Sequence, residues 1–353
     1  MSGIKRTKLG LTIATLVATS AATAGVAGGG VAGAAETRSR DSVASFTATT
    51  AAATAGVEYW TRKRMANAKP YQVRPGASTG MGQGARTAAS PTGPRVTVPP
   101  AAGGLGSNVI APQAAAALAR PYTNLPDRLN VKVFFTGATG GNFVCSGTIV
   151  NSSTKRMVST AGHCVSDGVG GWHTNVVVVP GYSSQCNGCG DAPFGRWPAR
   201  VVTTLSEWHL FSNLKQDVGY IVTKDRNRTR IVNQLGGHGT KFNVARSQQF
   251  RSYGYPQAAP FDGFNPYVCP SSRLANDNPT SGPGPLTMRI SCDMTGGSSG
   301  GGWLIKASGG LGFVNSVNSY KYVGGPKANE NHMYGPYFGN EALDLFNFTV
   351  GRG

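Results

Sequence analysis

The last two thirds of the chain alternate short apolar runs with turn residues. From Arg128 onward, runs rich in β-branched and aromatic residues are broken by Gly, Pro, Asn and Asp at intervals of about 8–15 residues. This spacing is typical of an all-β sandwich or barrel rather than of alternating strands and helices. Only 341–348, near the C-terminus, has a helical pattern. The predicted strands are Val131–Phe135, Phe143–Val150, Met157–Thr160, Asn175–Val179, Val218–Thr223, Gln248–Tyr253, Thr287–Ser291, Trp303–Ile305 and Leu311–Val317.

The N-terminus has the pattern of a secretory signal. Three basic residues among the first eight precede an uncharged run, 9–35, which is apolar at first and rich in Gly and Ala later. The run ends in Ala32-Gly33-Ala34, the small-x-small sequence that signal peptidases accept. It lacks the roughly 20 consecutive apolar residues of a membrane-spanning helix. We therefore predict a signal peptide over 1–34, no membrane span, and a secreted, extracellular protein.

Residues 35–127 differ in composition from the region that follows. They contain no Cys, are rich in Ala, Thr, Gly and Pro, and offer little apolar surface to bury. This composition predicts a pro-segment that is largely disordered or extended and is removed near Asp127. Its two adjacent aromatic residues, within Tyr59–Met65, suggest a docking contact.

Composition narrows the function classes. The net charge is +18, yet only 14% of the residues are charged, which argues against coiled coils and long charged helices. No stripe of Lys and Arg is interleaved with aromatic residues, so we predict no nucleic-acid partner. The basic N-terminal segment leaves contact with an anionic cell envelope as an open alternative.

All six cysteines fall between Cys145 and Cys292. An even number of cysteines outside the cytosol favours disulfides, and six allow 15 pairings. The sequence Cys186-Asn187-Gly188-Cys189 has no second CxxC and no nearby pair of histidines. We therefore interpret it as a small disulfide loop rather than a zinc or redox site, and expect no metal.

Three motifs in the β region supply the groups that a serine nucleophile needs. His163 lies in Thr160-Ala161-Gly162-His163-Cys164, Asp217 opens an apolar strand, and Ser299 lies among glycines in Gly297-Ser298-Ser299-Gly300-Gly301. A serine hydroxyl is a poor nucleophile unless a base accepts its proton, and the base needs a carboxylate to fix its tautomer. The glycines allow a tight turn that exposes the hydroxyl and directs N–H groups inward.

These motifs, in the order His, Asp, Ser, resemble those of the chymotrypsin-like and trypsin-like serine peptidases. More closely, the chain resembles secreted actinobacterial trypsin-like peptidases related to the staphylococcal glutamyl endopeptidases. The resemblance implies that His163 is the general base, Asp217 its orienting carboxylate and Ser299 the nucleophile. It also implies an oxyanion hole formed by the backbone N–H groups of Gly297 and Ser299.

The same resemblance implies two Greek-key β-barrels, at 128–235 and 236–353, the second followed by a short helix. It further implies an acyl-enzyme mechanism that uses no cofactor or metal, protein or peptide substrates, and a monomer. Trypsin has an Asp just before its nucleophile, where this chain has Ser298, so activation by an ion pair at that position is not expected. The implied disulfides are Cys145–Cys164, Cys186–Cys189 and Cys269–Cys292.

Substrate preference is less clearly encoded. The residues considered for the specificity pocket are Asp293, Thr295, Val314, Asn315 and Ser316. Glutamyl peptidases use a His on the strand after the nucleophile, and this stretch, 312–317, has none. Without a donor, a buried substrate carboxylate would be costly, so we predict that the enzyme is not strictly glutamyl-specific. Asp293 is either an acid that selects Arg or Lys, or a structural carboxylate.

Two other functions are compatible with these motifs. A catalytically silent protein could keep the fold and bind an anionic envelope, although the intact triad argues against it. An esterase could use the same triad. A fluorophosphonate probe distinguishes a peptidase from the silent protein, because only an activated serine is labelled. A comparison of amide with ester turnover distinguishes a peptidase from an esterase.

Overall fold

The computed structural model describes residues 42–73, 75, 93–105, 117–118, 124–183, 191–308, 310–324 and 329–353. The predicted signal peptide and the Cys186–Cys189 pair lie outside these residues. All described residues belong to one compact unit, Ser39–Gly353. No helix among them is long and apolar enough to cross a membrane.

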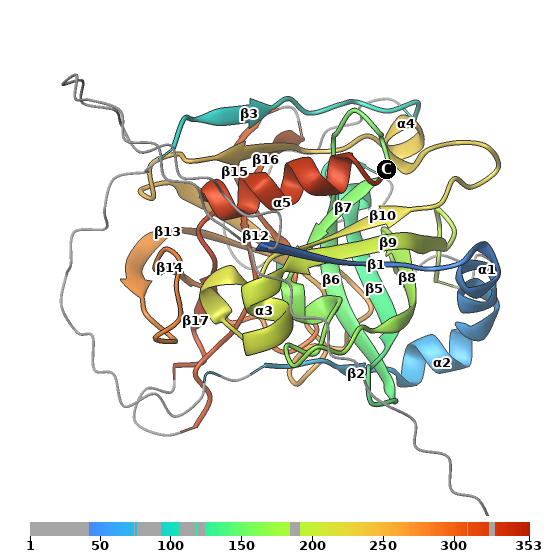
Figure 1. Ribbon diagram of the computed structural model, residues 1–353, viewed down its shortest axis with the longest axis horizontal. Helices are drawn as coiled ribbons and strands as arrows, with labels where there is room; N and C mark the ends of the chain where they lie inside the picture. Colours follow the sequence, from blue (N-terminus) through green and yellow to red (C-terminus); the bar gives the residue numbers. More distant parts are fainter. Residues whose placement is uncertain are drawn as a thin grey trace, which may run out of the picture. The chain divides into compact units, whose positions relative to one another are not determined.

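The first sheet closes into a barrel of six strands, in the order β9-β10-β7-β6-β5-β8, because β8 also pairs with β9. β1 adds to this sheet beside β9, and β2 adds beside β6 (Figure 1). Its strands are β1 (Val43–Thr47), β2 (Lys69–Pro70), β5 (Asn130–Thr136), β6 (Asn142–Val150), β7 (Met157–Thr160), β8 (Thr174–Pro180), β9 (Trp197–Leu205) and β10 (Gly219–Thr223).

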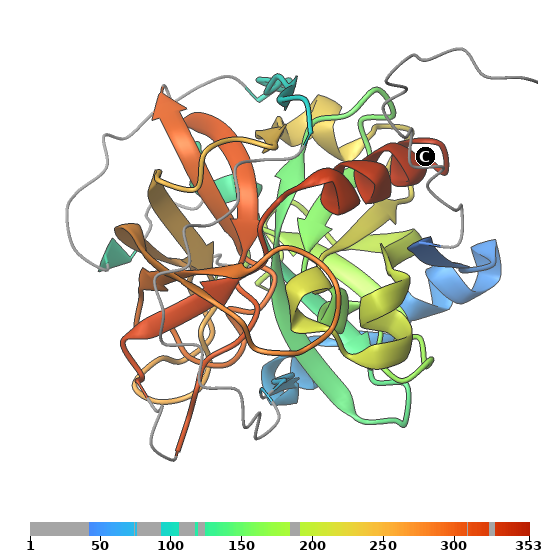
Figure 2. The ribbon, with the colours of Figure 1, turned by 60° about the vertical axis from the view of Figure 1, so that its left-hand side comes forward.

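The second sheet has the order β17-β14-β13-β12-β15-β16-β11-β3, and β4 pairs with β13. In Figure 2 its orange and red strands lie beside the green strands of the first barrel. Its strands are β3 (Val96–Val98), β4 (Ala117–Leu118), β11 (Gly239–Phe242), β12 (Gln249–Gly254), β13 (Tyr267–Asp277), β14 (Thr287–Ser291), β15 (Gly302–Ser308), β16 (Leu311–Val317) and β17 (His332–Gly335). The predicted all-β class with two chymotrypsin-like barrels is confirmed.

Short helices connect and cover the sheets. α5, the predicted C-terminal helix, lies across β9 and β10 of the first barrel (Figure 1), where Phe346 meets Tyr220 edge to face at 5.7 Å. The helices are α1 (Thr50–Tyr59), α2 (Arg62–Asn67), α3 (Ser206–Phe211), α4 (Ile231–Leu235) and α5 (Asn340–Val350), with 3-10 turns η2 (Asp127–Leu129), η3 (Gly162–Cys164) and η4 (Leu214–Gln216).

The described parts of the predicted pro-segment are structured, contrary to the expectation of a largely disordered stretch for those residues. The side chains of Thr49 and Thr61 accept hydrogen bonds from backbone N–H groups and cap α1 and α2. Trp60 is fully buried and packs on Phe134 at 5.4 Å. The Tyr59–Met65 island is therefore a docking contact, made on the first barrel.

This contact explains why one residue on the outer face of β5 is a buried aromatic. Val131, Val133 and Phe135 point into the barrel core, whereas Phe134 belongs to the cluster that contains Trp60. The other outward positions of β5, Asn130, Lys132 and Thr136, are polar. The N-terminal segment thus covers an outer barrel surface that would otherwise expose aromatic side chains.

Candidate active site

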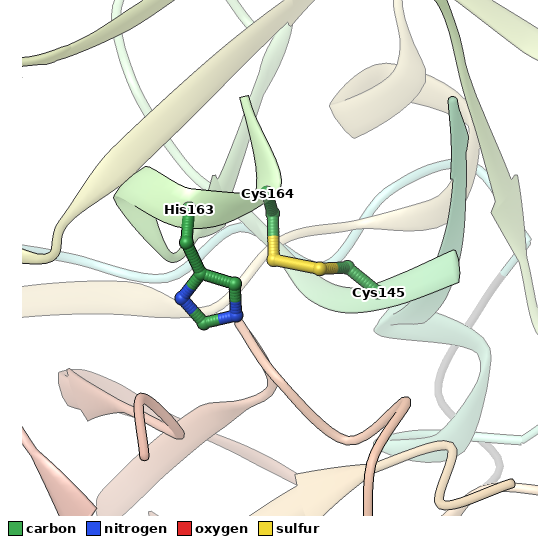
Figure 3. Close-up of side chains that lie close together, drawn as sticks. All are labelled: Cys145, His163 and Cys164. Carbon is green, nitrogen blue, oxygen red and sulfur yellow. A yellow bond between two sulfur atoms is a disulfide. The ribbon is translucent and has the colours of Figure 1, made fainter. Parts of the chain in front are cut away.

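His163 lies on the 3-10 turn η3, directly after strand β7. The neighbouring Cys164 forms a disulfide with Cys145 of β6, with a Cα–Cα distance of 6.0 Å. Figure 3 shows the imidazole of His163 beside this disulfide. The bridge ties the turn to the adjacent strand and restricts the backbone that carries the imidazole. The second implied disulfide, Cys269–Cys292, is also present.

Asp217 lies between η4 and β10 and holds His163 by two hydrogen bonds. Its Oδ2 is 2.7 Å from His163 Nδ1, and its Oδ1 accepts the His163 backbone N–H at 2.7 Å. The Ser319 hydroxyl donates to Oδ2 at 2.5 Å. Both the imidazole and the carboxylate are fully buried. A carboxylate at Nδ1 assigns the ring proton to Nδ1 and leaves Nε2 as the basic nitrogen.

The Nε2 atom of His163 is buried and has no hydrogen-bond partner among the described residues. A buried polar atom without a partner is costly, because it loses its hydrogen bonds to water. With Nδ1 bonded to Asp217, Nε2 is the ring nitrogen that remains able to accept a proton.

Ser299 lies in the turn between β14 and β15. Gly297 and Gly300 on either side have φ values of +99° and +82°, which side chains with a Cβ rarely adopt. A Cβ at Gly300 would lie 2.2 Å from Thr160 Oγ1 and 2.4 Å from Ser146 O. Only glycine therefore allows this turn to approach β6 and β7 closely enough to bring Ser299 to the first barrel.

Backbone and hydroxyl contacts join the two sheets at this turn. The Ser299 carbonyl accepts the Ser146 N–H at 2.6 Å, and the Ser146 hydroxyl donates to Gly297 O at 2.8 Å. The Ser146 hydroxyl also accepts the Tyr255 N–H at 2.8 Å. Neither the Gly297 N–H nor the Ser299 N–H donates a hydrogen bond to another described residue. These are the two N–H groups predicted to form the oxyanion hole.

Comparison with solved structures identifies the family. Protease Anisep from Arthrobacter nicotinovorans is 36% identical, with a TM-score of 0.56, over 65% of this chain and 98% of Anisep. The thermostable serine protease AL20, from an extremophilic microorganism, is 36% identical, with a TM-score of 0.56, over 64% of this chain and 98% of AL20. The chain belongs to the chymotrypsin-type serine proteases of bacteria.

A third structure, a Glu endopeptidase, shares the fold at 16% identity and a TM-score of 0.52, over 69% of this chain and 100% of that protein. No family model and no curated protein matches the chain. The protease is a serine endopeptidase of the chymotrypsin type.

Three of the residues predicted for the specificity pocket of the protease point elsewhere. Val314 is buried in the barrel core, Asn315 Nδ2 donates to Lys241 O at 2.8 Å, and the Ser316 hydroxyl donates to Pro336 O at 2.7 Å. Their place in the pocket stays a prediction, and the residue that bonds Asp217 lies farther along the chain, at Ser319.

The other two predicted pocket residues lie just before the nucleophile turn. The Thr295 hydroxyl donates to Ala258 O at 2.7 Å, which leaves it as a structural contact. Asp293 is exposed and follows the Cys269–Cys292 disulfide.

Lys321 is a residue of this site that the sequence analysis missed. Its ammonium donates to Met294 O at 2.9 Å and to Cys292 O at 3.2 Å, and it also bonds Glu330 O. Burial lowers the pKa of Lys321 to about 8, while Asp293 and Glu330 act to raise it. The segment just before the nucleophile turn therefore binds a lysine ammonium through its carbonyl groups. In the sequence, only the position of this lysine between Tyr320 and Tyr322 could have indicated a cation here.

Two clusters of potential metal ligands occur in the described part of the chain, namely Cys145, His163 and Cys164, and Cys269, Cys292 and Asp293. In each cluster both sulfur atoms belong to a disulfide, so neither offers a thiolate to a metal ion.

Proposed function

We propose that the protease cleaves peptide bonds through a Ser299–His163–Asp217 triad and an acyl-enzyme. The observation that carries this proposal is the buried pair of His163 and Asp217, which leaves His163 Nε2 unpartnered. That nitrogen is the one that must accept the proton of a serine hydroxyl.

In the acylation step the Ser299 hydroxyl oxygen bonds to the scissile carbonyl carbon, and its proton passes to His163 Nε2. The carbonyl oxygen becomes an oxyanion that the N–H groups of Gly297 and Ser299 stabilise. The C–N bond then breaks, and the leaving amine takes the proton from Nε2. Water, deprotonated by the same nitrogen, hydrolyses the acyl-enzyme and regenerates Ser299.

Asp217 serves each proton transfer without losing its charge. Its two bonds to the His163 side chain and backbone hold the ring in one orientation, and its negative charge stabilises the imidazolium. Ser319 occupies a second lone pair of the carboxylate and keeps it oriented.

The test is the Ser299→Ala variant, compared with the wild type on chromogenic amide and ester peptides and with a fluorophosphonate probe. Turnover is expected to fall on the order of 10⁴- to 10⁶-fold, with an unchanged circular dichroism spectrum, because no packing is lost. Near-normal hydrolysis by this variant would refute the triad. Hydrolysis of esters alone by the wild type would point to an esterase.

The protease is further proposed to be a secreted zymogen, with residues 1–34 as signal peptide and 35–127 as a removable pro-segment. The share of this chain that Anisep and AL20 match, about two thirds, is close to the share taken by 128–353. N-terminal sequencing of secreted material tests the boundary. A mature N-terminus at Ala35 in fully active enzyme would contradict processing near Asp127.

A further inference from the structure

Part of the N-terminal segment, residues 68–73, lies directly over the predicted catalytic residues. The Tyr71 ring stacks on the His163 imidazole, with 6.2 Å between centroids and 19° between planes. It also meets His173 edge to face at 5.0 Å and Phe143 at 5.0 Å. His163 is 0% exposed in the full chain.

The backbone of this segment binds the protease as an extended peptide would. The Tyr71 N–H donates to Val144 O at 3.1 Å, and β2 pairs in parallel with β6. Ala68 O accepts from Gln257 Nε2 at 2.6 Å. Main-chain hydrogen bonds of this kind to a strand edge are a common mode of peptide recognition.

The segment continues across the nucleophile turn. A Cβ placed on Gly296 would lie 1.8 Å from Gln72 Nε2, so the Gln72 amide rests on the backbone just before Gly297. Val73 then packs against the aromatic cluster that contains Trp208 and Tyr320. From Ala68 to Val73, the segment thus passes both the base and the turn that carries Ser299.

We propose that residues 68–73 are an intramolecular inhibitor seated in the peptide-binding cleft, and that their docking surface accepts this extended segment of the same chain. The inference rests on the proposed triad. A substrate carbonyl must reach Ser299 while His163 accepts its proton, and the Tyr71 ring occupies the face of His163 that such a substrate would approach. The segment must therefore leave before peptides are cleaved.

An anchor outside the cleft holds the inhibitor in place. The fully buried Trp60 donates from Nε1 to Asn175 O at 2.7 Å, and Met65 lies in the same apolar cluster. Arg62 forms a two-pronged pair with Asp191, with both N···O distances at 3.2 Å. Because the anchor is covalently joined to the inhibitor, the effective concentration of Tyr71 at the cleft is high.

Lys132 orients the side chain of Gln257, which binds the inhibitor segment. Its buried ammonium donates to Gln257 Oε1 at 2.8 Å and to Gly263 O at 2.7 Å. The oxygen of the Gln257 amide is thereby committed to Lys132, and its NH₂ group faces Ala68 O. This bond fixes the amide in the orientation that binds a peptide carbonyl.

The experiment measures how fast a fluorophosphonate probe labels the intact, unprocessed full chain, separated from processed enzyme on a gel. We compare the wild type with Tyr71→Ala and with Tyr71→Phe, which keeps the ring contacts. Phe46→Ala is the matched control, because Phe46 lies on β1 of the same segment and stacks on Trp172. Ser299→Ala gives the background.

Tyr71→Ala is expected to label at least tenfold faster than the wild type, while Tyr71→Phe and Phe46→Ala label as slowly as the wild type. Unfolding cannot mimic this result, because an unfolded chain loses its activated serine and labels more slowly. Equal labelling of the intact wild type and Tyr71→Ala, at the rate of processed enzyme, would overturn the inhibitor and leave the triad standing. Absence of labelling in every variant and in processed enzyme would instead refute the proposed function.

Discussion

The two sides of the active site are built by different means. On the first barrel, side-chain groups fix His163, since Asp217 bonds both its ring and its backbone N–H, and a disulfide follows in the chain. On the second sheet, backbone conformation fixes Ser299, since the positive φ values of Gly297 and Gly300 shape its turn.

This difference determines how each side can fail. The histidine side depends on the chemical identity of a buried polar network, so an isosteric change of one atom suffices to disrupt it. The serine side depends on the absence of side-chain atoms, so adding a methyl group disrupts it.

The largest effect is expected for Asp217→Asn on the histidine side. The amide keeps the shape of the carboxylate but can donate to His163 Nδ1, which would place the ring proton on Nε2. A protonated Nε2 cannot accept the Ser299 proton, so kcat should fall by about 10⁴-fold with little loss of stability. Steady-state kinetics and thermal melting measure both quantities. A loss below tenfold would show that Asp217 does not set the tautomer.

Gly300→Ala should have the next largest effect, on the serine side. The new Cβ would lie 2.2 Å from Thr160 Oγ1 and 2.4 Å from Ser146 O, at a φ of +82°. Overpacking and backbone strain together should lower the free energy of unfolding by about 3 kcal/mol or more, and turnover should fall with it.

Gly140→Ala is the matched control for this variant. Gly140 has a φ of +94°, but a Cβ there meets nothing within 4 Å. Only the strain of a positive φ applies there, and the free energy of unfolding should fall by about 1 kcal/mol. Equal losses in urea denaturation would show that close approach to the first barrel does not matter at Gly300.

The triad candidates could be named from sequence for a physical reason. His163 and Asp217 each adjoin an apolar run, where strand ends place polar groups beside the core, and Ser299 lies among glycines that allow a tight turn. By contrast, Trp60 is embedded in an Ala-rich and Thr-rich stretch whose composition suggests disorder, and its burial depends on a distant barrel face. The hydrogen bonds of Asn315 to Lys241 and of Ser316 to Pro336 join segments far apart in the chain, which no local pattern reveals.

Strand prediction failed where apolar alternation is interrupted. β9 contains Pro198 and Arg200, and β13 contains Pro270 with largely half-exposed neighbours. Pairing with other strands compensates for the interrupted pattern in β9, which lies between β1 and β10 and closes the barrel with β8. Such long-range pairing overrides local propensity and cannot be seen in a single segment.

The histidine side should also be the more sensitive to acid. His173 Nδ1 accepts the Ala138 N–H, and its Nε2 donates to the His163 carbonyl, so the ring is neutral in this network. Burial lowers the pKa of His173 to about 4. Between pH 6.5 and 4 the unfolded chain binds the proton and the folded chain does not, so stability falls as the pH falls through this window.

The expected loss at His173 is roughly 3 kcal/mol across that window. His173→Gln, which can accept and donate at similar positions, should flatten the profile by that amount. Urea denaturation at pH 4 to 7 gives the two profiles, and their difference isolates His173 from other titrating groups. Identical slopes would contradict the assignment.

The smallest effect is expected on the serine side, from the charge of Lys321. The ammonium is anchored on the carbonyls of Met294 and Cys292, just before the nucleophile turn, and we expect its charge to repel a basic substrate side chain and attract an acidic one. Lys321→Met keeps an unbranched apolar chain of nearly the same length and removes the charge. Turnover of peptides with Lys before the cut should rise about tenfold relative to matched peptides with Glu, because partly screened charges at this range contribute about 1–2 kcal/mol.

Asp293→Asn should lower this ratio of Lys-peptide to Glu-peptide turnover, and by less, since Asp293 is exposed to solvent. A ratio that Lys321→Met leaves unchanged would mean that the ammonium only ties the wall together, and the difference between the two sides would then lie in backbone geometry alone.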